Sequence, residues 1–186
     1  MGVSRDHLES LYAETDDPWD FRGSPYERTR LAAVEAALPG PLFGHALELG
    51  CGNGELARRV APRCRAYTGL DAVETALAAA RRAVPGARFV RGLLPCPLPS
   101  PDPLPCDLVI LSEVLYFLDH GQIDALAGLL RLGCPRAPVL CVIWLGPTGD
   151  QLSGEDALDS FERAVGRARE MLHDGPSSRI DLMGSA

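Results

Sequence analysis

Short apolar runs alternate with longer segments of helical periodicity along most of the chain. Apolar runs of this length, bounded by turn residues and separated by helix-like stretches, are typical of buried strands in a βαβ series. The predicted strands are residues 45–50, 66–71, 87–92, 106–112 and 138–144. Helices are expected to start near Glu55, Val73 and Gly121, and a last one to run from about Glu155 to Leu172. This alternation predicts an α/β protein, a three-layer sandwich around a mostly parallel sheet.

Two amphipathic helices are predicted before the first strand, joined by the irregular segment "TDDPWDFRGSPY" at residues 15–26. This segment brings Trp19, Phe21 and Tyr26 close together, which polar linkers rarely do. Two interpretations remain open: a hydrophobic plug that covers the edge of the sheet, or a lid over a ligand.

Proline occupies nearly every second position of "PCPLPSPDPLPC", residues 95–106. Because proline fixes φ and has no N–H group, we predict a rigid, extended crossover between two strands. A ligand for a proline-recognition domain is the less favoured alternative. At the other end of the chain, "SSRIDLMGSA" (177–186) is expected to form at most one short strand.

Composition narrows the classes of function. The 186 residues carry a net charge of −7, which argues against a phosphate-tracking nucleic-acid surface. No apolar run is long enough to span a membrane, and the N-terminus lacks a signal pattern, so a cytoplasmic location without membrane attachment is expected.

The sequence contains no lysine, which excludes Schiff-base chemistry and a Walker-type phosphate site. The six cysteines form no C-x-x-C pair, so no metal site is expected.

A glycine-rich turn follows the first predicted strand in "LELGCGNGEL", where Gly50, Gly52 and Gly54 are spaced G-x-G-x-G. Glycines at a strand-to-helix turn allow positive φ and let a ligand approach the backbone closely. A nicotinamide dinucleotide requires a further glycine at position 55, where this chain has Glu55, and a carboxylate there would repel a pyrophosphate. The spacing therefore favours S-adenosylmethionine, which carries no phosphate.

Acidic residues at the ends of the first two strands support the same cofactor. Asp71 follows the loop by about twenty residues, where a carboxylate can accept both ribose hydroxyl protons. Glu48, at the end of the first strand, is a candidate ligand for the methionine ammonium, directly or through water.

The stretch "CDLVILSEVLYFLD" (106–119) passes from an apolar strand into a polar cluster. Glu113 and Tyr116 come just after the predicted fourth strand, at the edge where open α/β sheets bind ligands. We predict that they position the acceptor, with Glu113 a candidate base. The alternative is structural: Glu113 caps a turn and Tyr116 packs against the next helix. His120 is expected to be a surface residue at the start of that helix.

With these residues in view, the chain resembles the class I S-adenosylmethionine-dependent methyltransferases, which have a Rossmann-like fold. "ALELGCGNGEL", "YTGLDAVETALAAAR" and "CDLVILSEV" are similar to their first motif, second strand and helix, and fourth strand. The combination of "DPW" near the N-terminus with "SEVLYFLD" resembles the nodulation protein S-like methyltransferases, whose founding member N-methylates the free amine of a chitooligosaccharide. The resemblance spans about residues 15–160.

The resemblance implies a single methyltransferase domain over residues 1–186, with a helical cap (1–40) and a cofactor-binding core (41–186). The chain departs from the family in a shortened C-terminus, which is expected to lack room for the usual closing strand pair. Many relatives have an acid near the adenine ring, where this chain has Leu93 and Leu94. The full set of candidate cofactor contacts is Trp19, Glu48, Gly50, Cys51, Gly52, Gly54, Asp71, Ala72, Leu93, Leu94 and Ser112.

Three hypotheses remain open from the sequence. The favoured one is methylation of a small-molecule amine, such as an amino sugar, because an acidic pocket rimmed by aromatic residues suits a cationic acceptor. The second is O-methylation of a natural-product hydroxyl. The third is a non-catalytic module that binds S-adenosylmethionine, suggested by the short C-terminus. A monomer or a weak homo-oligomer is expected.

Overall fold

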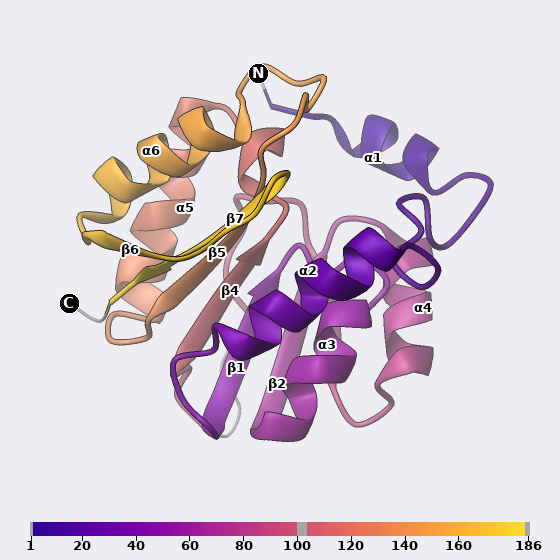
Figure 1. Ribbon diagram of the computed structural model, residues 1–186, viewed down its shortest axis with the longest axis horizontal. Helices are drawn as coiled ribbons and strands as arrows, with labels where there is room; N and C mark the ends of the chain where they lie inside the picture. Colours follow the sequence, from indigo (N-terminus) through magenta and orange to yellow (C-terminus); the bar gives the residue numbers. More distant parts are fainter. Residues whose placement is uncertain (1, 100–103, 185–186) are drawn as a thin grey trace.

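The computed structural model describes residues 2–99 and 104–184, and in them seven strands form one sheet in the order β3-β2-β1-β4-β5-β7-β6 (Figure 1). The first five strands run parallel, and β7 is antiparallel to both β5 and β6. The strand bounds are β1 Phe43–Leu49, β2 Cys64–Asp71, β3 Arg88–Arg91, β4 Leu108–Ser112, β5 Val139–Trp144, β6 Arg169–Asp174 and β7 Ser178–Met183. All five predicted strands are present, and the Rossmann-like sandwich is confirmed.

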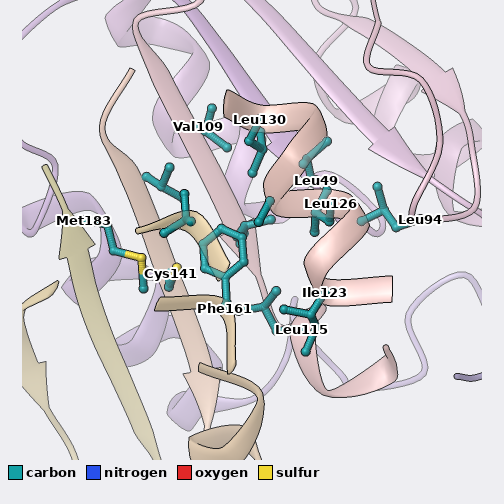
Figure 2. Close-up of a cluster of buried hydrophobic side chains, with 14 of the residues drawn as sticks. Leu49, Leu94, Val109, Leu115, Ile123, Leu126, Leu130, Cys141, Phe161 and Met183 are labelled. Carbon is teal, nitrogen blue, oxygen red and sulfur yellow. The ribbon is translucent and has the colours of Figure 1, made fainter. Parts of the chain in front are cut away.

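Two hydrophobic cores lie on opposite faces of the sheet, because successive side chains of a strand point to opposite sides. Leu108 and Ile110 of β4 belong to the core beneath helices α2, α3 and α4, whereas Val109 and Leu111 belong to the core beneath α5 and α6. Figure 2 shows the second core, in which Phe161 lies among side chains of the sheet and of α5. Burial on both faces explains why β4 is continuously apolar.

The helices flank the sheet in two groups (Figure 1). Their bounds are α1 Arg5–Leu11, α2 Pro25–Ala36, α3 Glu55–Val60, α4 Glu74–Ala83, α5 His120–Gly133 and α6 Gly154–Val165, with short 3₁₀ turns at Ala61–Arg63 (η1) and Leu115–Phe117 (η2). Local signals set several of these ends. Ser24 caps α2 and Pro25 occupies its first turn, while Asp119 and Gln122 form a capping box at the start of α5.

The C-terminal part differs from the sequence expectation. Instead of running to Leu172, α6 ends at Val165, because Gly166 adopts a left-handed conformation (φ 70°) that stops the helix. The following residues form β6, which pairs with β7 as an antiparallel closing pair. The expectation that the chain lacks room for this pair was wrong. The polar edge strand "REMLHD" carries little β signal of its own, which is why its sequence does not indicate a strand.

The segment between α1 and α2 is folded around one carboxylate. Asp17 accepts hydrogen bonds from the backbone N–H groups of Phe21 and Arg22 and from the side-chain amide of Asn53, which lies in the glycine turn. This last contact joins the N-terminal segment to the core of the protein. Residues that appeared to form an irregular linker are therefore a compact loop.

The proline-rich crossover leads from β3 to β4. Its residues 95–99 and 104–106 form neither helix nor strand, as the prolines predict, and residues 100–103 lie outside the described residues. In the part of the chain that the structure describes, no helix combines the length and apolar character that crossing a membrane requires.

Candidate functional site

A cavity of about 660 Å³ opens at the carboxyl ends of the parallel strands, beneath the N-terminal segment. Open α/β sheets bind ligands at this edge, and the volume is that of a small-molecule site. The loops after four successive strands and the end of β5 each contribute to its wall. The contributing residues include Gly50, Gly52, Asp71, Ala72, Val73, Gly92, Leu93, Leu94, Ser112, Glu113 and Trp144.

The three glycines of the first turn all have positive φ, but they serve different needs. A Cβ at Gly50 would lie 2.9 Å from Val114 Cβ, and one at Gly54 would lie 2.8 Å from Ala80 Cα. Neighbouring residues thus leave no room for a side chain at either position, which explains the glycines there. A Cβ at Gly52 would meet nothing closer than the Tyr12 hydroxyl at 3.5 Å. Gly52 lines the cavity, so its backbone is open to a ligand.

Asp71 joins the glycine turn to the start of α4. One carboxylate oxygen accepts the N–H of Gly52 at 2.8 Å, and the other accepts the N–H of Val73 at 3.0 Å. Burial raises the pKa of this carboxyl group, and the backbone hydrogen bonds oppose that rise. The result is a carboxylate fixed on the cavity wall with acceptor capacity left for a ligand.

Eight of the predicted cofactor residues line the cavity and three do not. Those on the wall are Trp19, Gly50, Gly52, Asp71, Ala72, Leu93, Leu94 and Ser112, and the others are Glu48, Cys51 and Gly54. Glu48 shares the strand face of Ala46, which points into the core beneath α2 to α4. Its carboxylate accepts a hydrogen bond from the Tyr67 hydroxyl, and burial raises its pKa to about 7. The structure therefore does not bring Glu48 to the cavity for direct contact with an ammonium group.

Glu113 and Tyr116 lie together on the cavity wall. The Tyr116 hydroxyl donates to Glu113 Oε2 at 3.0 Å, so the two side chains act as one unit. Glu113 adopts a left-handed backbone conformation (φ 53°), which is uncommon for a non-glycine residue, while its N–H donates to the carbonyl of Val142. Burial raises the pKa of Glu113 to about 7, against the influence of Arg30 and of the Tyr116 hydroxyl.

Helix α2 supplies charged residues that the sequence analysis missed. Arg30 is buried, contacts Glu27 Oε2 through Nη2 at 2.6 Å, and lies 3.4 Å from Glu113 Oε1 through Nη1. Tyr26 of the same helix packs edge-on against Trp144, with ring centroids 5.8 Å apart. A signal was present in the sequence: Arg30 falls between apolar positions of a helix, next to Leu31 and one turn before Val34.

Aromatic side chains of the N-terminal segment cover the part of the cavity next to Gly52. The Trp19 ring lies 5.5 Å from that of Tyr12 and 5.7 Å from that of Phe21, and all three residues line the cavity. Tyr12 was not among the predicted residues. Its hydroxyl pKa is raised, chiefly by burial and then by the charge of Asp71. The segment therefore covers a hollow space, as a lid does, and is not only a plug against the sheet.

His120 lies outside the cavity. His120 is exposed at the start of α5 and contacts Ser160 Oγ through Nδ1 at 2.9 Å, so it lies apart from Glu113 and Tyr116. Among the described residues, no group of three or more histidine, cysteine or acidic side chains is arranged to hold a metal ion.

Two curated proteins illustrate what this chain is similar to. It is 32% identical over 138 residues to nodulation protein S of Rhizobium tropici, a match that covers 71% of this chain and 58% of the relative. It is 33% identical over 123 residues to trans-aconitate 2-methyltransferase of Acidovorax ebreus, covering 64% of this chain and 46% of the relative. The chain thus spans about half the length of the curated relatives it matches.

A solved structure has the same fold over nearly the whole chain. The N-methyltransferase NodS of Bradyrhizobium japonicum, in complex with S-adenosyl-L-homocysteine, superposes with a TM-score of 0.77 at 18% identity, covering 97% of this chain and 98% of the other. The sequence profile of the nodulation protein S family matches residues 4–132, which contain the glycine turn, Asp71 and the Glu113–Tyr116 pair. The chain therefore belongs to the nodulation protein S (NodS) family.

Proposed function

We propose that this protein is an S-adenosylmethionine-dependent methyltransferase that methylates the amine of a small molecule, such as an amino sugar. The observation that carries the proposal is the cavity itself, whose wall includes the Gly52 backbone, the Asp71 carboxylate and the Glu113–Tyr116 pair. Family membership supports it, since the solved NodS structure is described as an N-methyltransferase and one curated relative is named a methyltransferase.

The residues present fit this cofactor. Gly52 leaves space where a side chain would fill the wall, and the fixed Asp71 carboxylate suits a pair of ribose hydroxyl groups. Leu93 and Leu94 offer apolar surface for an adenine ring, and Trp19 and Phe21 cover the cavity with aromatic faces, which attract a cation. When bound, the cofactor would supply a sulfonium-activated methyl group.

The part of the cavity around Glu113 and Tyr116 suits a nucleophile that carries a proton. Besides Asp71, three carboxylates line the cavity, those of Glu27, Glu113 and Asp150, together with the buried guanidinium of Arg30. A predominantly acidic wall favours a basic amine over an anionic acceptor. Glu113 and Tyr116 would orient the amine, Glu113 would take up its proton, and the N-terminal lid would exclude water.

O-methylation remains the alternative, since trans-aconitate, which appears in the name of one relative, contains oxygen and no nitrogen. The hypothesis of a non-catalytic module loses its main support, because β6 and β7 complete the sheet. We further propose that residues 1–40 serve as the cap of a single domain, and that the protein acts in the cytoplasm on a small molecule.

Two measurements test the proposal in sequence. Calorimetry with S-adenosylhomocysteine should show binding by the wild-type protein and at least about tenfold weaker binding by Asp71→Asn, which loses the charge that holds the ribose. Asp124→Asn, the same change at an exposed site on α5, should bind as wild type does. Absence of binding by the wild-type protein would end the cofactor proposal.

The acceptor is then sought with a labelled methyl donor and matched panels of amines and alcohols. Mass spectrometry of the products should show label on amine nitrogen. Label only on hydroxyl oxygen would replace the amine proposal with the O-methylation alternative.

A further inference from the structure

Arg30 is a buried cation next to the proposed reaction centre. Only 4% of its surface is exposed, and its guanidinium stacks over the Phe21 ring at 5.6 Å. Nε and Nη2 both contact Glu27 Oε2, at 2.8 and 2.6 Å. Because burying an arginine is costly, such a residue is retained where its charge has partners. Glu27 contacts Nε and Nη2 of the guanidinium but not Nη1.

The remaining nitrogen points at Glu113. Arg30 Nη1 lies 3.4 Å from Glu113 Oε1, and both atoms are buried without a hydrogen bond to any residue that the structure describes. The other oxygen of Glu113 accepts the Tyr116 hydroxyl. The Glu113 carboxylate is thus held from two sides, by a cation from the cap and by a hydroxyl from η2.

Several groups besides Arg30 face this carboxylate. Helix α2 also contributes Glu27 and Tyr26, β5 contributes the N–H of Trp144, and Asp150 of the following loop acts on Tyr116. Burial is the main influence on Glu113 and favours its neutral form; Arg30 is the largest influence in the opposite direction, and Glu27 works against Arg30. The charge state of Glu113 therefore depends on a guanidinium shared between two acids.

We propose that Arg30 is a positioning residue, whose guanidinium holds the Glu113 carboxylate in its charged form and in place to accept the proton of the acceptor. In that step the N–H bond of the acceptor breaks, its electron pair stays on nitrogen, and an O–H bond forms on Glu113. The reaction role rests on the methyltransferase function proposed above. The effect of Arg30 on the Glu113 carboxylate does not rest on that function. The effect on the carboxylate and the role in the reaction can therefore be tested separately.

The direct test is infrared titration of the Glu113 carboxyl group without ligand, identified by subtracting the spectrum of Glu113→Gln. In Arg30→Met the titration should move to higher pH than in the wild type, whereas Arg30→Lys, which keeps the charge, should stay close to wild type. Arg28→Met makes the same change at an exposed site on α2 and should leave the titration unmoved. An unshifted titration in Arg30→Met would overturn the proposal.

Glu27→Gln provides a second test that keeps Arg30 in place. Removing the competing acid should move the Glu113 titration to lower pH, opposite to the effect of Arg30→Met. If Arg30→Met fails to fold, Glu27→Gln still tests the proposal. An unchanged titration of Glu113, or a shift to higher pH, would contradict the proposal that Glu27 and Glu113 share the Arg30 guanidinium.

The kinetic test uses the pH dependence of methyl transfer. In Arg30→Met the acid limb of the profile should move to higher pH. Turnover at neutral pH should fall about tenfold for each pH unit of this shift and should recover at higher pH. A uniform loss at every pH would indicate a merely structural role and overturn the catalytic part. If the wild-type protein transfers no methyl group, the proposed function fails, while the infrared titration still decides what Arg30 does to Glu113.

Discussion

At the scale of single residues, two buried carboxylates with similar pKa values differ in what surrounds them. Burial raises the pKa of both Glu48 and Glu113 to about 7. The charge of Arg30 acts on both, but Glu113 lines the cavity with Arg30 3.4 Å away, whereas Glu48 points into a core and accepts a hydrogen bond from the Tyr67 hydroxyl. Both are candidate functional acids in the sequence, because burial and orientation are not visible there.

Replacing Glu113 tests its role as a base. Glu113→Gln should lower turnover with an amine acceptor by about 10²-fold or more while leaving the affinity for S-adenosylhomocysteine within about twofold of wild type. In the wild type, turnover should decline as the pH falls through about 7, because the pKa of Glu113 is raised to that value and the base becomes protonated. Steady-state kinetics across pH and calorimetry measure the two effects. Unchanged turnover would exclude the base role of Glu113.

Glu48 should affect stability in a pH-dependent way. A carboxyl group whose pKa is higher in the folded than in the unfolded state stabilises the protein below the unfolded value and loses this contribution as pH rises to about 7. Glu48→Gln keeps an acceptor for Tyr67 without the charge, so it should raise the free energy of unfolding by about 1–3 kcal/mol above pH 7 and much less in acid. Urea unfolding at several pH values measures this. An equal effect at acidic and basic pH would contradict it.

At the scale of elements, the glycine turn serves packing as much as ligand binding. Gly54 begins α3 with φ 84°, against the backbone of α4 at Ala80. Gly52, two residues earlier, is the glycine with open space. A sequence motif that appears uniform therefore divides into positions fixed by the fold and a position left for the ligand.

Gly54→Ala should destabilise the protein by about 2–4 kcal/mol, since the added Cβ would lie 2.8 Å from Ala80 Cα on a backbone with positive φ. Gly86→Ala is the matched control, because a Cβ there meets nothing within 4 Å and φ is not positive. Denaturant unfolding of both variants checks the difference. Equal stabilities would show that α3 and α4 separate easily at this point.

The N-terminal lid depends on Asp17, which binds two backbone N–H groups of its own loop and Asn53 of the glycine turn. Asp17→Ala should speed hydrogen exchange in residues 12–24 and weaken S-adenosylhomocysteine binding by about tenfold, with little change in the exchange of the sheet. Asp124→Ala on α5 is the control. Faster exchange throughout the sheet would indicate global destabilisation instead of a loosened lid.

At the scale of the whole molecule, the order β3-β2-β1-β4-β5-β7-β6 collects four loops at one edge, and the N-terminal segment closes over them. A ligand enclosed in this way binds the folded state only. S-Adenosylhomocysteine at about 100 times its Kd should therefore raise the free energy of unfolding by about 2.7 kcal/mol. Thermal unfolding with and without the ligand measures this, with adenosine alone as a weaker comparison. No rise in Tm would contradict an enclosed site.

The sequence by itself determined the parallel core of this protein, the glycine turn and the family. These are local signals: continuous apolar strands, a strand-to-helix turn and short motifs, all readable in one segment at a time. Even the end of α6 was signalled locally by Gly166, although the polar strand after it was not recognised.

Only the tertiary structure decided which candidate residues share a site. It placed the Glu48 side chain in a core and packed three aromatic rings against one another over the cavity. It also brought Arg30 of α2 to within 3.4 Å of Glu113, which is 83 positions further along the chain. The strand pair β6–β7 is likewise stabilised by pairing with β5 and not by the propensity of its own residues. Burial, orientation and long-range charge pairing depend on how elements pack, and no single segment of the chain encodes them.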